Sequence, residues 1–156
     1  MERLSLAALG LALLVLAGCS SAPKQAPTKQ AGPEVGAVVA QHALEMRGKP
    51  YRYGGSSPRG FDCSGLVQYS YARVNMRLPR STEGLWSSSR AVSRSDIRPG
   101  DLLFFHQEGK RNSHVAIYVG SNRFVHAPSS GKQVSTASLS DHYWSRHFSA
   151  ARRPAL

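Results

Sequence analysis

Apolar positions repeat at helical spacing in two stretches of the chain. The first stretch begins at Pro33, which suits the first turn of a helix, and stops at Gly48-Lys49-Pro50, which ends one. The second follows Asp62-Cys63-Ser64-Gly65, so Asp62 is expected as the N-cap and Cys63 in the first helical turn. The apolar stripes of the two helices are Val35, Val38, Val39, Ala43 and Met46, and Leu66, Val67, Tyr71 and Val74.

Three later segments, 102–105, 114–119 and 123–127, are rich in β-branched and aromatic residues and are predicted to be β-strands. The last two should form a hairpin. If Gly120-Ser121-Asn122 is a three-residue turn, Ala116 lies opposite His126, and His114 and His126 share a face about 7 Å apart. A two-residue turn at Ser121-Asn122 would place the two histidines on opposite faces.

The N-terminal segment has the pattern of a signal peptide. Arg3 is followed by an apolar stretch from Leu4 to Ala17, which is too short for a membrane span of ~20 residues. Ala17-Gly18 before Cys19 resembles a bacterial lipobox, which implies that Cys19 carries a lipid. We therefore expect a signal peptide at 1–18, the lipidated cysteine and a flexible tether at 19–32, and one folded domain at 33–156.

Charge adds information about partners. The chain has 20 basic and 9 acidic residues and a formal net charge of +11, which favours polyanions such as acidic wall polymer or anionic lipid headgroups. No nucleic-acid-binding motif accompanies the basic residues, so no nucleic-acid partner is expected. The length of 156 residues fits one domain with one core.

Only two cysteines are present, and if Cys19 is acylated, Cys63 has no partner for a disulfide. A free thiol outside the cytoplasm is better explained by its reactivity than by packing. The start of a helix should lower the pKa of that thiol. A thiol nucleophile also needs a base and a group that orients the base, and His114 and His126 can fill those roles.

Six motifs in order resemble the NlpC/P60 family of cysteine peptidases, which hydrolyse peptidoglycan stem peptides. Together with the lipobox, they resemble the small outer-membrane lipoproteins of that family that act as murein endopeptidases. The resemblance implies an α+β fold, a reduced papain-like domain in which the nucleophile-bearing helix packs on an antiparallel β-sheet. The motifs are Pro50-Tyr51-Arg52-Tyr53-Gly54-Gly55, Phe61-Asp62-Cys63-Ser64-Gly65-Leu66-Val67, Leu78-Pro79-Arg80-Ser81-Thr82, Arg98-Pro99-Gly100-Asp101-Leu102, Ser113-His114-Val115-Ala116-Ile117-Tyr118-Val119-Gly120 and Phe124-Val125-His126-Ala127.

The same resemblance implies a role for each site residue. Cys63 attacks the scissile carbonyl, His114 acts as base and then as acid, and His126 orients His114. Tyr51 helps the Cys63 amide to stabilise the oxyanion. Asp62 and Ser64 match positions that contact the stem peptide, although helix capping and local hydrogen bonding explain them equally well.

The resemblance also implies partners and a location. Peptidoglycan is the expected substrate, no metal or cofactor is expected, and we expect a monomer. Ser20 after the lipidated cysteine suggests anchoring in the outer membrane, facing the periplasm, of a two-membrane cell.

Three other functions stay open at this point. One cysteine and two histidines could hold zinc, the domain could bind the cell wall without catalysis, or it could transfer an acyl group to an amine. The target bond is also open: it is either the D-alanyl cross-link between stems or the bond after D-glutamate within one. Asp101 is expected as a turn residue, His106 and His142 as solvated, and Trp86, Tyr143 and Trp144 as packing or groove-lining aromatics.

Overall fold

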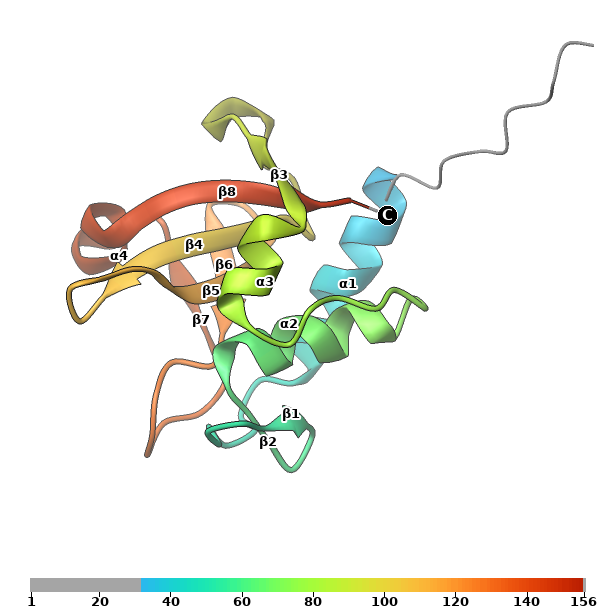
Figure 1. Ribbon diagram of the computed structural model, residues 1–156, viewed down its shortest axis with the longest axis vertical. Helices are drawn as coiled ribbons and strands as arrows, with labels where there is room; N and C mark the ends of the chain where they lie inside the picture. The colour runs from blue at the N-terminus through green and yellow to red at the C-terminus, as the bar shows by residue number, and fades with distance from the viewer. Residues whose placement is uncertain (1–31, 156) are drawn as a thin grey trace, which may run out of the picture.

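The structure is a computed structural model that describes residues 32–155 (Figure 1). The expected signal peptide, Cys19 and nearly all of the tether lie outside these residues. Four helices, eight strands and a 3₁₀ turn make up the described part. In chain order they are α1 (Pro33–Glu45), β1 (Ser56–Ser57), β2 (Gly60–Phe61), α2 (Cys63–Ala72), α3 (Thr82–Ser87), β3 (Ser89–Val92), η1 (Arg94–Asp96), β4 (Leu102–Gln107), β5 (Lys110–Gly120), β6 (Arg123–His126), β7 (Ser135–Ser138), α4 (His142–His147) and β8 (Phe148–Pro154).

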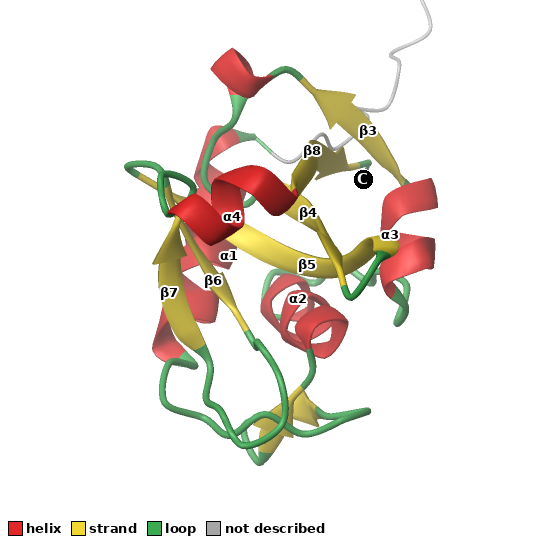
Figure 2. Ribbon diagram, turned by 90° about the vertical axis from the view of Figure 1, so that its left-hand side faces the viewer, coloured by secondary structure: helices red, strands yellow, loops and turns green. Residues whose placement is uncertain are grey.

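Six strands form one antiparallel sheet in the order β3-β8-β4-β5-β6-β7. Alternate residues of its central strands belong to two separate buried clusters, one on each face. The helices α1 and α2 cover the face with the larger cluster, while the short helix α4 lies across the sheet on the other side (Figure 2). This is the expected α+β arrangement of a helix that bears the cysteine and packs on an antiparallel sheet.

The hairpin of β5 and β6 has the predicted strand register but a different turn. Ile117 pairs with Val125 and Tyr118 with Phe124, so Ala116 and His126 are in register and the two histidines share a face. The turn, however, has two residues, Ser121 and Asn122, with φ of 49° and 59°. A register shift between Tyr118 and Gly120 adds one residue to β5 and compensates for the shorter turn. The three-residue turn was therefore wrong, and a β-bulge restores the register that it implied.

Helix α1 begins at Pro33 as predicted, and it ends at Glu45, before Met46 and the predicted stop at Gly48-Lys49-Pro50. It approaches the loop before β4 closely: a Cβ at Gly36 would overlap the carbonyl oxygen of Pro99. His42 is partly buried and lies 3.3 Å from a carboxylate oxygen of Glu45. Among residues 32–155, no helix is long and apolar enough to span a membrane.

Asp101 does more than close a turn. It accepts a hydrogen bond from the backbone N–H of Arg98 at 2.9 Å, as a turn residue does. Its side chain is also only 2% exposed and forms a two-pronged ion pair with Arg153 of β8, at 2.6 and 2.7 Å. The prediction missed this pair because its partner lies 52 residues later in the sequence.

Candidate active site

Helix α2 begins at Cys63 because three local features favour a helix start there. The carboxylate of Asp62 accepts the backbone N–H of Gly65 at 2.8 Å, which confirms Asp62 as the N-cap. Phe61 before it is fully buried and anchors the approaching chain. A Cβ at Gly65 would overlap the carbonyl oxygen of Gly55, so glycine is needed where the loop crosses the helix. The nucleophile candidate is thus held on a rigid element at its first residue.

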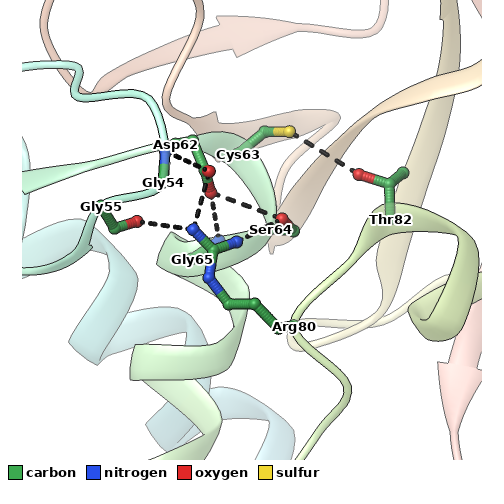
Figure 3. A network of polar contacts seen from close by, with 8 residues as sticks. All are labelled: Gly54, Gly55, Asp62, Cys63, Ser64, Gly65, Arg80 and Thr82. Carbon is green, nitrogen blue, oxygen red and sulfur yellow. Dashed lines mark hydrogen bonds and ion pairs between the residues drawn. The ribbon is translucent and has the colours of Figure 1, made fainter.

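A polar network surrounds this helix start (Figure 3). Asp62 accepts hydrogen bonds from the N–H of Gly54 at 2.9 Å and from Arg80 at 2.7 Å. Arg80 also donates to the Ser64 hydroxyl at 2.8 Å and to the Gly55 carbonyl at 3.3 Å. Ser64 in turn donates weakly to Asp62, at 3.4 Å. Arg80 therefore ties the loop, the nucleophile helix and the start of α3 together.

This network shows that the local roles considered for Asp62 and Ser64 are both present. A carboxylate offers about four acceptor positions, and four donors already use the two oxygens of Asp62. Ser64 is 5% exposed, whereas Arg80 keeps 37% of its side chain exposed. Arg80 is the more accessible polar group, and sequence reasoning quoted its motif without assigning it a role.

The environment of Cys63 differs from the expectation of a lowered pKa. Burial raises the pKa of its thiol, and the negative charge of Asp62 raises it further. The N–H groups of Val115 and Ser64 and the hydroxyl of Thr82 act in the opposite direction. Because burial is the largest influence, the expectation of a thiolate favoured by the helix start was wrong for this state. The raised pKa favours the neutral thiol near pH 7.

The sulfur of Cys63 lies 3.9 Å from the hydroxyl oxygen of Thr82. No hydrogen bond between Cys63 and His114 is formed among the described residues. The sulfur nevertheless lies beside the strand that carries His114. The backbone N–H of Val115 is close enough to lower the pKa of the thiol, and Ser113 lines the same cleft as Cys63.

His114 of β5 and His126 of β6 form a buried pair on the sheet. Nε2 of His114 lies 2.9 Å from Nδ1 of His126, and the side chains are 2% and 3% exposed. The hairpin register produces this contact, since the two residues are diagonal neighbours on one face. With Nε2 engaged, Nδ1 of His114 is the ring nitrogen left for the thiol.

Trp144 of α4 covers both imidazoles. Its ring stacks on His114 at 5.7 Å between centroids and meets His126 edge-on at 4.8 Å. Burial lowers the pKa of both histidines well below the ordinary value. Repulsion from a protonated His126 lowers the pKa of His114 further, and the charge of Lys132 lowers the pKa of His126 further. Both rings are therefore neutral near pH 7, and a neutral His114 can accept a proton.

A cleft of about 500 Å³ opens at the start of α2. Cys63, Asp62 and Ser64 line it together with Tyr51, Arg80 and Thr82. Burial raises the pKa of Tyr51, and the charges of Cys63 and Asp62 add to the rise, so the phenol stays protonated and can donate a hydrogen bond. The structure thus brings four predicted site residues to one cleft and pairs the other two beside it.

Other expectations about single residues had mixed outcomes. Trp144 packs on the core and lines a cleft, as expected for a groove-lining aromatic, and Trp86 packs edge-on against Phe104. His142 is exposed, but His106 is partly buried and its Nδ1 accepts the N–H of Asn112. Within residues 32–155, no three His, Cys, Asp or Glu side chains are grouped so that they could hold a metal ion.

Comparison with known proteins gives consistent matches. The profile of the NlpC/P60 family matches residues 48–153. Murein DD-endopeptidase MepH of Escherichia coli is 44% identical over 121 residues, which cover 74% of this chain and 45% of that protein. The E. coli protein named "Probable endopeptidase NlpC" is 37% identical over 144 residues and is covered to 93%, against 90% of this chain. The chain therefore spans less than half of MepH and nearly all of the second relative.

A solved structure supports the same assignment. It is a protein from Staphylococcus aureus described as similar to lipoprotein, NLP/P60 family. It superposes with a TM-score of 0.72 at 36% sequence identity, and the match covers 83% of this chain and 44% of that one.

Proposed function

Because the chain belongs to the NlpC/P60 family, we propose that it is a cysteine peptidase that hydrolyses peptide bonds in peptidoglycan. The observation that carries the proposal is the neutral histidine pair of β5 and β6, together with a thiol at the first residue of α2 that lies beside β5. The name of MepH, a murein DD-endopeptidase, supports peptidoglycan as the substrate.

In the proposed first step, Cys63 turns from Thr82 towards Nδ1 of His114 and gives up its proton as the sulfur attacks the carbonyl carbon. A carbon–sulfur bond forms, and the carbonyl oxygen becomes negative. The free N–H of Cys63 at the helix start and the Tyr51 phenol donate hydrogen bonds to that oxygen. His126 holds the ring of His114 through the 2.9 Å contact and stabilises its protonated form.

In the second half, the carbon–nitrogen bond breaks and His114 returns the proton to the leaving nitrogen. The acyl group remains on Cys63 as a thioester. Water then attacks the thioester carbon, giving one proton through His114 back to the sulfur, and the product leaves as a carboxylic acid that loses its remaining proton to solvent. Each proton transfer to or from the sulfur, the leaving nitrogen and the attacking water passes through His114.

Replacement of Cys63 or His114 tests the proposal. Cys63→Ala and His114→Ala should each lower the release of fragments from purified peptidoglycan by roughly 10³-fold or more, because the nucleophile and the base act as one unit. Mass spectrometry of the released muropeptides measures the loss. His142→Ala, which removes an exposed histidine outside the site, is the matched control and should keep full activity. Undiminished digestion by Cys63→Ala would rule the mechanism out.

The same digestion in heavy-oxygen water separates the remaining alternatives. A hydrolase places one solvent oxygen in the new carboxylate, whereas a transferase forms an amide and incorporates none. A domain that only binds the wall retains peptidoglycan and releases no fragment.

We also propose that Cys19, which lies outside the described residues, is lipidated and anchors the enzyme in the cell envelope at the outer membrane. The sequence Leu16-Ala17-Gly18-Cys19 supports this proposal. Cys19→Ala should move the protein from the membrane fraction to the soluble fraction, while the purified variant digests peptidoglycan at the wild-type rate. Fractionation followed by immunoblotting measures the shift, and a variant that stays in the membrane fraction would contradict it.

A further inference from the structure

A second cleft lies on the histidine side of the site and takes no part in the mechanism above. Its volume is about 490 Å³, and it shares no lining residue with the cleft of Cys63. Trp144 and Tyr143 of α4 form its aromatic wall, Lys132 comes from the loop between β6 and β7, and Glu108 comes from the turn between β4 and β5.

Two contacts connect this cleft to the reacting groups. Trp144, which lines it, is the residue that stacks on His114 and meets His126 edge-on. The carbonyl of Lys132 accepts the N–H of Tyr51 at 2.9 Å, so one loop borders both clefts. The ammonium group of Lys132 is also near enough for its charge to lower the pKa of His126.

The chemistry of peptide cleavage assigns the two clefts to different halves of a substrate. The acyl half stays bonded to Cys63, so it occupies the cleft that Cys63 lines. The amine half departs with a proton from His114, so its nitrogen must lie on the side of the imidazole. The cleft beside the histidine pair is then the place for the residue that carries the leaving nitrogen.

We infer that this second cleft binds the leaving residue, and that Lys132 pairs with a free carboxylate on it. This inference rests on the proposed function. The aromatic wall of Tyr143 and Trp144 suits an aliphatic stem. Among residues 32–155, Lys132 has no carboxylate partner within 4.0 Å, so its ammonium group is available to a ligand. Glu108 lines the same cleft, and its negative charge disfavours a ligand that places a second carboxylate near Glu108.

The inference narrows the choice of target bond. Inside a linear stem, the carboxyl group on the carbon that bears the leaving nitrogen is part of the next peptide bond and carries no charge, and a diamino diacid there keeps a free carboxylate only at the far end of its side chain. A terminal residue, or a diamino diacid cross-linked through its side chain, has a free carboxylate on the carbon that bears the leaving nitrogen. Lys132 therefore favours cleavage at a cross-link or at the end of a stem over cleavage within a stem.

Two synthetic stem-peptide substrates test this inference with the full-length protein. They are identical except that the leaving residue carries a free carboxylate in one and a primary amide in the other. Wild type should cleave the carboxylate substrate with about tenfold higher kcat/KM, as expected for loss of one charge-assisted contact. Lys132→Gln should abolish the preference, and Lys132→Arg should retain most of it. Lys110→Gln, which removes an exposed lysine outside the cleft, should match wild type.

The comparison of substrates separates the possible failures. Removing the charge of Lys132 also changes the pKa of His126. That effect changes kcat/KM by the same factor for both substrates. Equal cleavage of both substrates by wild type, or an equal loss on both in Lys132→Gln, overturns the carboxylate contact and leaves the peptidase intact. Failure of wild type to cleave either substrate overturns the peptidase itself, and the inference with it.

Discussion

At the scale of single residues, the site depends on keeping two imidazoles neutral. His114 and His126 are almost fully buried, and burial is the largest cause of their lowered pKa values. Trp144 packs against both rings, although it takes no part in bond making. It is therefore a positioning residue, which acts on the reaction through the histidines.

Replacing Trp144 tests this role through pH dependence. In Trp144→Leu, water reaches the imidazoles and their pKa values should rise towards about 6.5. Since a protonated His114 cannot accept the thiol proton, the acid limb of the kcat/KM profile should move to higher pH. Rates measured from pH 4 to pH 8 would show the shift.

The matched control for that experiment is Trp86→Leu, which removes a tryptophan packed against Phe104 and Arg152 rather than against a histidine. Its acid limb should coincide with that of wild type. If both variants lost activity in parallel without a change in the profile, the role of Trp144 would be packing alone.

At the scale of elements, the sequence predicted what local chemistry determines. Asp62 capped the helix as expected because an N-cap depends on residues within one turn. The thiol pKa was mispredicted because it depends on burial by distant segments, which local spacing does not reveal. Arg80 went unassigned for the same reason, since its partners Asp62 and Ser64 lie 18 and 16 residues away.

The hairpin of β5 and β6 shows how one element can be predicted correctly for an incorrect reason. Turn length and the β-bulge each change the strand register by one residue, and only their sum places His114 beside His126. Turn length alone was considered from the sequence, because Ser121 and Asn122 give no sign of a bulge two residues earlier. A change of one residue between the histidines therefore keeps them on one face only where a β-bulge absorbs it.

At the scale of the whole molecule, the last strand completes the fold. β8 lies between β3 and β4 in the sheet, so β4 is paired on both sides only when residues 148–154 are in place. Arg153 of β8 forms an ion pair with Asp101, the residue before β4. Arg152 donates a hydrogen bond to the carbonyl of Ser89, the first residue of β3. The ion pair of Asp101 and Arg153 is largely buried, so its loss cannot be compensated by water.

Asp101→Asn should therefore destabilise the protein by roughly 3 kcal/mol, because it leaves the Arg153 guanidinium buried without a counter-charge. Urea denaturation at pH 7 measures the change in free energy of unfolding. Glu34→Gln, at an exposed position in the first turn of α1, is the control and should change it by less than about 1 kcal/mol. Activity per folded molecule should be unchanged in both. Equal stability of the two variants would show that the buried pair contributes little.

The lone thiol of the described residues has a practical consequence for the protein as a whole. Cys63 is the free cysteine among residues 32–155, and packing of one sheet between helices holds the domain together without a disulfide bond there. Reducing agents that protect the nucleophile from oxidation therefore leave the scaffold intact. Conversely, an oxidant that converts Cys63 to a sulfenic acid or a mixed disulfide inactivates the enzyme and leaves it folded, so reduction restores activity without refolding.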